Sequence, residues 1–350
     1  MTLPGKQGPL PVIRAHYADI LCQLAEELGV ARAPLLASAG IRPVQLGHPD
    51  NFITLEQFTG LCREALARCK DDALGLAFGL RLKFTTHGSL AQAAISCDTL
   101  EEAIGVLIKY FRTRFVYMDL TFFEEGDEAV LQLDPGHGLA DLERFNVDVV
   151  MASLLDVNQL LFGNRLILDG ECRVVYPEPT DRAPYHRLFG DQILFGARAN
   201  QLRFNRRLLS LPIALSNPVA RRVAEAQCEQ ELKSIDASIT VTERVRRLLA
   251  PGGDGRIPDL ETVAAQLSMS ARTLRRQLAS EGVRFQTLQD AQRHRRALVL
   301  LQRPGLTIEA VAEQVGYSDP SNFGRAFRKW EGVSPSAWRA RLAPDDHSSR

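Results

Sequence analysis

A short helical pattern occurs twice in the last third of this 350-residue chain, with the two copies 48 residues apart. Both copies carry apolar residues at positions i, i+3, i+4 and i+7, a spacing that places them on one face of a short helix. The residues are Leu260, Val263, Ala264 and Leu267, and then Ile308, Val311, Ala312 and Val315. A tight turn follows each copy, at residues 268–270 and 316–318, and a second helical stretch follows each turn. The sequence therefore predicts two helix-turn-helix units, because one such pair often arises by accident whereas two in tandem do not.

The second helix of each unit has an apolar side and a polar side. If Leu274 and Leu278 are buried in the first unit, and Phe323 and Phe327 in the second, then periodicity places the polar residues on the exposed side. Arginine suits guanine in the major groove and asparagine suits adenine, so these residue types predict base reading. The predicted DNA-contacting residues are Arg272, Arg275, Arg276, Ser321, Asn322 and Arg325. The alternative interpretation is two ordinary solvated helix faces.

A third amphipathic stretch, residues 285–301, separates the two units and predicts a linker helix. A helix of ~16 residues is ~24 Å long, and successive major-groove faces of DNA recur at ~34 Å. One copy of the chain could therefore read two adjacent major-groove segments. The net charge of the whole chain is zero, yet residues 270–303 hold eight Arg against two acidic residues. This local excess predicts a surface that faces phosphates.

The segments SMSARTLRRQL and LTIEAVAEQVGYSDPSNFGRAFRKWEGVSPSAWR resemble the DNA-binding domain of AraC/XylS-type bacterial regulators. The resemblance covers residues 239–341. It implies a seven-helix domain with two recognition helices, whose base-reading positions fall on the six residues named above. Ser268 departs from the pattern, because the first turn has serine where the second has Gly316.

The first two-thirds of the chain predicts a mixed α+β domain in which helices precede the strands. Helical periodicity begins near residue 13 and again at residue 52, and residues 114–135 then alternate with a Gly126 turn, as a β-hairpin does. A long helix over 139–161 and short strands near 173–176, 192–195 and 201–204 follow. The fold class is therefore an α+β sensing domain with a small sheet, followed by an all-α domain with two helix-turn-helix units joined by a linker helix.

The front domain also carries a resemblance of its own. HGSLAQAAISCDTLEEAIGVLIKYFRTR, and later the aromatic pattern from Val175 to Pro212, are similar to the N-terminal domain of the ornithine-utilisation-regulator branch of the same family. The similarity covers residues 18–212. Because helices precede the strands, this domain does not resemble the jelly-roll sugar-binding domain of the arabinose regulator, and sugar binding is not carried over.

The domain boundary is predicted between residues 232 and 233. A helix starts at 216–218 with Pro218 in its first turn and is expected to run to about Leu232. The glycine-rich segment 251–255 is the alternative linker. We place the boundary earlier because the apolar face of the next helix, 241–249, needs a partner that the later helices can supply. The predicted domains are 1–232 for effector binding and dimerisation, 233–343 for DNA binding and 344–350 as a flexible tail.

Four residues of the front domain are candidate ligand contacts: His87, Arg112, Arg114 and Tyr117. Arginine can form bidentate pairs with a carboxylate, and His87 precedes a Gly-Ser pair at a predicted helix start. The alternatives are a structural histidine and a solvated strand edge for the arginines.

The rest of the sequence limits the possible function classes. Six cysteines lack a C-x-x-C pair, so neither a metal site nor a redox motif is expected, and no cofactor or catalytic constellation is predicted. The N-terminus lacks the apolar run of a signal peptide, and no stretch of ~18 apolar residues occurs, so we expect a cytoplasmic protein without a membrane partner.

The function predicted from these observations is a sequence-specific DNA-binding transcriptional regulator controlled by a small metabolite, not an enzyme. The expected partners are a double-stranded DNA operator, a small-molecule effector, a second copy of the chain and RNA polymerase. The sequence leaves open which effector binds, and whether the protein is an activator or a repressor. Two alternatives stay open: an enzyme or alkyl-transfer repair protein with an appended helix-turn-helix module, and a purely architectural DNA-binding protein.

Overall fold

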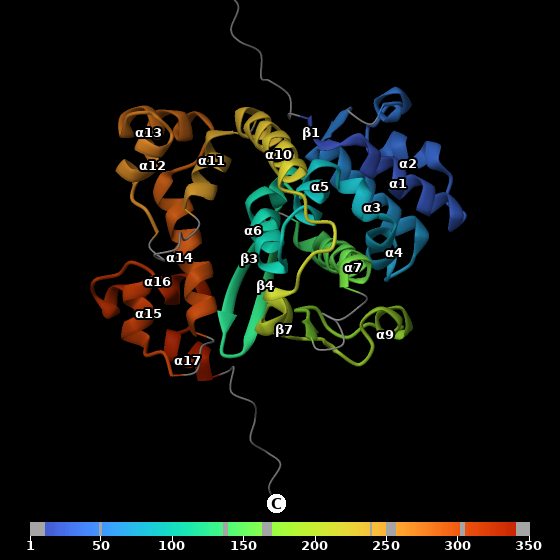
Figure 1. Ribbon diagram of the computed structural model, residues 1–350. Helices are drawn as coiled ribbons and strands as arrows, with labels where there is room; N and C mark the ends of the chain where they lie inside the picture. The colour runs from blue at the N-terminus through green and yellow to red at the C-terminus, as the bar shows by residue number, and fades with distance from the viewer. Residues whose placement is uncertain are drawn as a thin grey trace, which may run out of the picture. The chain divides into compact units, whose positions relative to one another are not determined.

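A computed structural model of the chain describes residues 11–48, 51–135, 139–162, 170–238, 240–249, 257–301 and 305–340. The chain divides into two compact units, an N-terminal unit (Met1–Ser238) and a C-terminal unit (Ile239–Arg350). Figure 1 labels most helices and several strands of both. The predicted tail, residues 344–350, lies outside the described residues.

Helices dominate the first part of the N-terminal unit, as predicted. They are α1 (Ala15–Glu27), α2 (Arg32–Ser38), α3 (Leu55–Cys69), α4 (Leu74–Arg81), α5 (Ser89–Ile95) and α6 (Leu100–Tyr110), with short 3-10 turns at Pro43–Leu46, Phe84–His87 and Phe111–Thr113. A small antiparallel pair, β1 (Pro11–Arg14) with β2 (Phe52–Thr54), was not predicted. The prediction that a helix starts at Phe52 was wrong by three residues, because Thr54 caps α3 through the backbone N–H of Gln57 and keeps the preceding residues extended.

A five-stranded sheet follows, in the order β3-β4-β7-β5-β6. Its strands are β3 (Met118–Glu125), β4 (Glu128–Pro135), β5 (Gly170–Arg173), β6 (Ile193–Leu194) and β7 (Asn200–Asn205). The predicted hairpin is confirmed, since β3 and β4 pair antiparallel around Gly126, whose φ is +62°. Leu131 of β4 lies opposite Leu202 of β7, and both are buried on the face of the sheet that packs against helices.

Helix α7 (Glu143–Phe162) confirms the predicted long helix and packs closely on α4. The contact depends on Gly75 and Gly79, which are one helical turn apart on α4. A Cβ at Gly79 would lie 2.5 Å from the carbonyl oxygen of Val149, and one at Gly75 would lie 2.7 Å from that of Phe145. The two helices can therefore approach this closely only because these positions lack side chains.

A buried carboxyl group anchors α7 to the segment that carries α9 (Ala183–Phe189). Asp148 accepts a hydrogen bond from the Tyr185 hydroxyl at 2.6 Å and another from the Tyr176 hydroxyl. Burial raises the pKa of Asp148 to about 7, although both hydrogen bonds oppose this shift. The two tyrosines of the Val175–Pro212 pattern thus have a packing role in the core.

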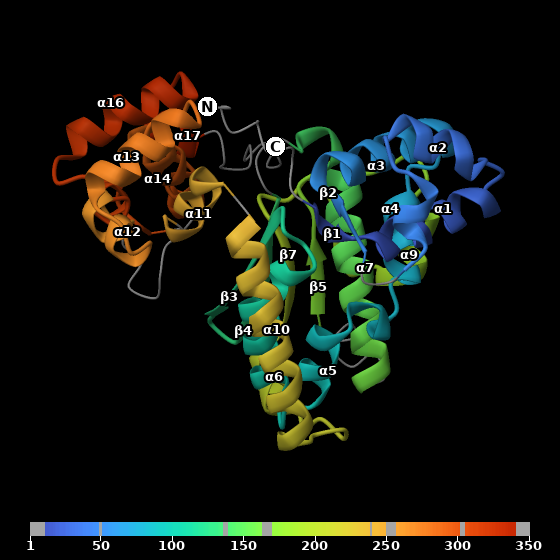
Figure 2. The same ribbon diagram turned by 90° about the horizontal axis from the view of Figure 1, so that it is seen from above.

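The last helix of the N-terminal unit is α10 (Pro218–Ser238), which Figure 2 shows beside α6. Ala224 and Cys228 are buried and pack among residues of α5 and α6 such as Leu90 and Val106. The helix extends six residues beyond the predicted end at Leu232, so the predicted boundary falls inside α10. Its buried residues continue to Ile235, which explains why the compact unit ends later than expected.

The described part of the C-terminal unit contains seven helices, α11 to α17. They are α11 (Val241–Leu248), α12 (Leu260–Gln266), α13 (Ala271–Ser280), α14 (Phe285–Leu301), α15 (Ile308–Gln314), α16 (Pro320–Glu331) and α17 (Pro335–Ala340). Helix α11 packs in the core of α12 and α13, as predicted, with Val245 fully buried, as is Leu249 directly after the helix. Helix α14 contributes Leu288 to this core and Leu301 to the core of α15 and α16.

Candidate DNA-binding surface and candidate effector cavity

The first candidate recognition helix is α13. The Ser270 hydroxyl caps it by accepting from the backbone N–H of Thr273 at 3.1 Å. Leu274 and Leu278 are buried in the core. The three predicted contacts, Arg272, Arg275 and Arg276, are all exposed. The structure therefore agrees with the prediction of which α13 residues face the core and which face solvent. Contact of these arginines with DNA stays a prediction.

The second candidate recognition helix is α16. Asp319 caps it by accepting from the backbone N–H of Ser321 at 2.8 Å, and Phe323 and Phe327 are fully buried. Ser321, Asn322 and Arg325 are exposed, and Arg325 donates to the side-chain oxygen of Asn322 at 2.5 Å. The three predicted residues of this helix are thus placed together on its outer side.

The two helix-turn-helix turns have the same backbone geometry despite their different sequences. Gly316 has a φ of +87° and Ser268 has a φ of +56°, so both residues adopt the left-handed conformation. This region favours glycine and costs a serine roughly 1–2 kcal/mol. The departure at Ser268 therefore leaves the turn intact and strains it locally.

The four predicted ligand contacts do not converge on one site. His87 is buried, and its ring Nδ1 lies 3.1 Å from the Tyr17 hydroxyl. Arg112 forms an ion pair with Asp119 at 2.6 Å, and Tyr117 is half-buried beside Phe58. Burial lowers the pKa of His87 to about 3, with the Arg114 charge acting in the same direction, so the ring is neutral.

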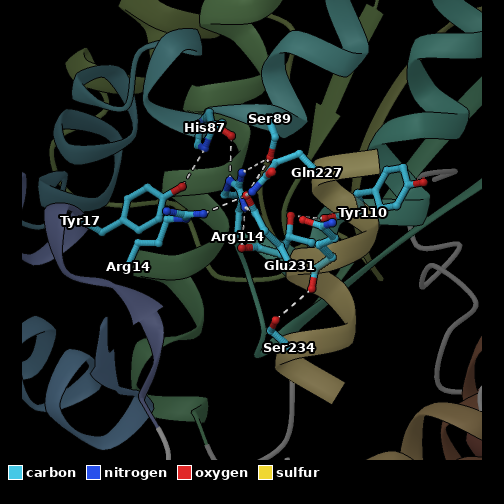
Figure 3. A network of polar contacts seen from close by, with 11 residues as sticks. Arg14, Tyr17, His87, Ser89, Tyr110, Arg114, Gln227, Glu231 and Ser234 are labelled. Carbon is cyan, nitrogen blue, oxygen red and sulfur yellow. Dashed lines mark hydrogen bonds and ion pairs between the residues drawn. The ribbon is translucent and has the colours of Figure 1, made fainter. Parts of the chain in front are cut away.

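Arg114 forms an ion pair with a carboxylate of the same chain, that of Glu231. Its side chain is 1% exposed, and its guanidinium donates to Glu231 of α10 at 2.5 Å, to the backbone oxygen of His87 at 2.7 Å and to the Ser89 hydroxyl at 2.9 Å. Figure 3 shows this network, in which Arg14 also reaches Glu231, at 2.9 Å. Burial opposes the charge on Glu231, yet the two arginines hold the pKa of Glu231 below its usual value. The sequence did not indicate Glu231, since 117 residues separate it from Arg114.

A cavity of about 110 Å³ lies among α5, α6, α7 and the sheet. Its walls are Phe84, His87, Leu90, Ala91, Ala94, Leu100, Ala103, Ile104, Leu107, Phe111, Phe115, Leu131, Val150, Ser153, Leu154, Leu155, Val157, Leu202 and Phe204. His87 alone among the four predicted ligand contacts reaches it. Arg114 and Tyr117 instead line a separate space of about 10 Å³, which is the size of one water molecule.

Three further observations bear on the remaining sequence expectations. All six cysteines are free thiols, and five of them are buried. The part of the chain that the structure describes contains no cluster of three or more His, Cys, Asp or Glu side chains able to hold a metal ion. None of the helices in that part is both long and apolar enough to span a bilayer.

Comparison with known proteins decides the family. Residues 29–213 match the profile of the arabinose-binding domain of AraC transcription regulators, and residues 263–341 match a helix-turn-helix domain profile. The chain is also 35% identical to the ornithine utilization regulator of Pseudomonas aeruginosa, over 94% of this chain and 96% of that protein. The chain belongs to the AraC family of transcriptional regulators.

Two further transcriptional regulators resemble this chain over most of its length. The chain is 29% identical to the transcriptional regulator VirS of Mycobacterium tuberculosis, over 94% of this chain and 96% of that protein. The crystal structure of the regulator CdpR from Pseudomonas aeruginosa covers 90% of this chain and 97% of its own, with a TM-score of 0.43 and 24% identity.

Membership of the AraC family settles the class of function. This AraC-family protein is a DNA-binding transcriptional regulator and not an enzyme, so the enzyme or repair-protein alternative is dropped. The profile matched by the N-terminal unit carries the arabinose name, which differs from our expectation that this domain is unlike that of the arabinose regulator. That expectation rested on helices preceding the strands. The structure has this order, since helices α1 to α6 come before the five-stranded sheet in the chain.

Proposed function

We propose that this AraC-family regulator reads two adjacent major-groove segments of its operator with α13 and α16, and that a small molecule in the N-terminal unit controls this binding. The observation that carries the first part is the matching geometry of the two helices. Each has a side-chain cap, a buried apolar side and three exposed polar residues at the predicted positions.

Helix α14 supports simultaneous reading by both helices. It has 17 residues and therefore a length of about 25 Å. Because its first turns belong to the core of α12 and α13 and its last turns to the core of α15 and α16, it joins the two helix-turn-helix units rigidly. Neighbouring major-groove faces are ~34 Å apart along DNA, a distance that two helices mounted on such a spacer can reach.

The test of this reading is Arg275→Ala in the full-length chain. An operator is first selected from a random-sequence duplex library, and affinities for it and for random DNA are then measured by gel shift. We expect operator affinity to fall between about 5-fold and 150-fold, as for one bidentate base contact, while affinity for random DNA is nearly unchanged.

The matched control is Arg284→Ala, which removes the same charge from an exposed residue outside α13. This variant should weaken binding to both DNAs equally, because a phosphate contact carries no sequence information. Equal losses on both DNAs for Arg275→Ala would mean that α13 does not read bases through this residue.

The second part of the proposal is that α10 transmits effector binding to the C-terminal unit. Leu90 of α5 and Ala103 of α6 line the cavity and also belong to the cluster that packs on α10. A ligand that moves α5 or α6 therefore moves the surface against which α10 packs. Helix α10 is the last helix before the C-terminal unit. Such couplings typically change affinity by a free energy of ~1–3 kcal/mol.

We also propose that the regulator is a homodimer and that α10 pairs with a second copy. Val219 and Val223 are one turn apart on α10 and are 62% and 68% exposed, so they form an apolar stripe on one face of the helix. Leu215, which is 59% exposed, lies in the turn that precedes the helix. Exposed apolar stripes of this kind mark association surfaces, and the stripe leaves Ala224 and Cys228 facing the unit's own core. Contact with RNA polymerase stays a prediction.

Val223→Glu is expected to convert the dimer to a monomer, because a charge in the paired stripe would be buried without a partner. Sedimentation velocity at micromolar concentration measures the change. Val44→Glu provides the matched control, since Val44 is 71% exposed on a different segment and its substitution should leave the dimer intact. A dimer that survives Val223→Glu would place the interface elsewhere.

A further inference from the structure

The wall of the 110 Å³ cavity is almost entirely apolar. His87 and Ser153 are the only polar side chains among the described residues that line it. The Ser153 hydroxyl already donates to the backbone oxygen of Gly79 at 3.1 Å. The His87 imidazole is neutral, because burial lowers its pKa to about 3. The remaining wall consists of aliphatic and phenylalanine side chains.

This wall excludes ligands that carry charge. Among the described residues, no Lys, Arg, Asp or Glu lines the cavity, and a charged group transferred to such surroundings loses its hydration without gaining a counter-ion. Arg114, the residue expected to grip a carboxylate, is already occupied by Glu231. Sugars are disfavoured for a related reason, since each buried hydroxyl needs a hydrogen-bond partner that aliphatic side chains do not offer.

We propose that the effector is an uncharged, apolar molecule about the size of one aromatic ring, bound in this cavity. The size follows from the volume, because an apolar cavity of about 150 Å³ holds benzene and this one is about 110 Å³. The proposal rests on the proposed function for its regulatory meaning. The ligand class itself rests on the cavity wall alone.

The test uses thermal unfolding of the full-length chain with four probes of one ring size. Benzene and toluene are the uncharged probes, and benzylamine and benzoate carry a positive and a negative charge on the same ring. At ten times Kd, an uncharged probe should raise the Tm by about 3 to 6 °C. The charged probes should leave Tm unchanged at the same concentrations.

Two cavity variants locate the bound probe. Ala91→Leu adds three carbons to the wall, fills the space and should abolish the shift caused by toluene. Leu155→Ala enlarges the space and should preserve the shift and admit the larger p-xylene. Leu155→Ala keeps the test decisive if Ala91→Leu fails to fold, because p-xylene should then raise the Tm of this variant more than that of the parent chain.

The outcomes separate the ligand class from the regulatory function. Shifts from benzylamine or benzoate without a shift from toluene would overturn the ligand class and leave effector control standing. The ligand class would also be overturned, and effector control left standing, if none of the four probes binds. Toluene binding that changes operator affinity, by between about 5-fold and 150-fold, supports both. Toluene binding without any change in operator affinity would support the ligand class but overturn effector control through this cavity.

Discussion

Replacing Arg114 with methionine is expected to lower the free energy of unfolding of the N-terminal unit by about 3–5 kcal/mol. Glu231 is 13% exposed and would be left as a carboxylate within the fold without its closest counter-ion. The backbone oxygen of His87 would also lose its donor. The loss should appear as a lower urea midpoint of the circular dichroism transition.

The chain provides an internal control for this measurement. Its two tryptophans, Trp330 and Trp338, both lie in the C-terminal unit, so tryptophan fluorescence reports unfolding of that unit. Arg114→Met should leave the fluorescence transition in place. Combining Arg114→Met with Glu231→Gln should recover much of the loss, because the unpaired charge is removed. No recovery in the double variant would mean that Arg114 acts through packing and not through its charge.

Gly79→Ala is expected to destabilise the N-terminal unit by about 3 kcal/mol. The added Cβ would lie 2.5 Å from the carbonyl oxygen of Val149 and 2.8 Å from the Cβ of Ala152. Neither atom can move away by a side-chain rotation, so α4 and α7 must separate. Urea unfolding followed by circular dichroism measures the change.

Gly105→Ala is the matched control for Gly79→Ala. Gly105 is an exposed residue of α6, and an added Cβ there would meet no atom within 4 Å. Alanine should therefore stabilise this helix by about 0.5–1 kcal/mol through its better helix propensity. If Gly79→Ala also stabilised the protein, helix propensity and not the close approach of α4 to α7 would govern both positions.

The features that could be predicted from the sequence are those encoded locally. Leu274 and Phe323 recur with their neighbours at helical spacing, so the exposed sides of α13 and α16 follow from periodicity alone. The hairpin around Gly126 was equally accessible, because alternation and a turn residue occur within one short segment. Helix α11 could be assigned to the C-terminal unit because its apolar face required a partner.

The features that could not be predicted depend on distant parts of the chain. Arg114 is held by Glu231, and nothing near residue 231 indicates that a buried arginine faces it. The β1–β2 pair joins residues about 40 positions apart with only three or four residues in each strand, which is too short for an alternation signal. His87 and Arg112 are 25 positions apart in the sequence, and the fold places His87 at the cavity wall and Arg112 beside Asp119.

The length of α14 has a consequence for how operators of this regulator can diverge. One residue added to or removed from a helix turns everything beyond it by about 100° and shifts it by about 1.5 Å. If α13 and α16 read one side of the duplex together, as proposed, a single deletion within α14 would rotate α16 away from the side that α13 faces. Under this proposal, the bases recognised at the operator can change through substitutions on α13 and α16, whereas the interval between the two recognised segments is set by the number of residues in α14.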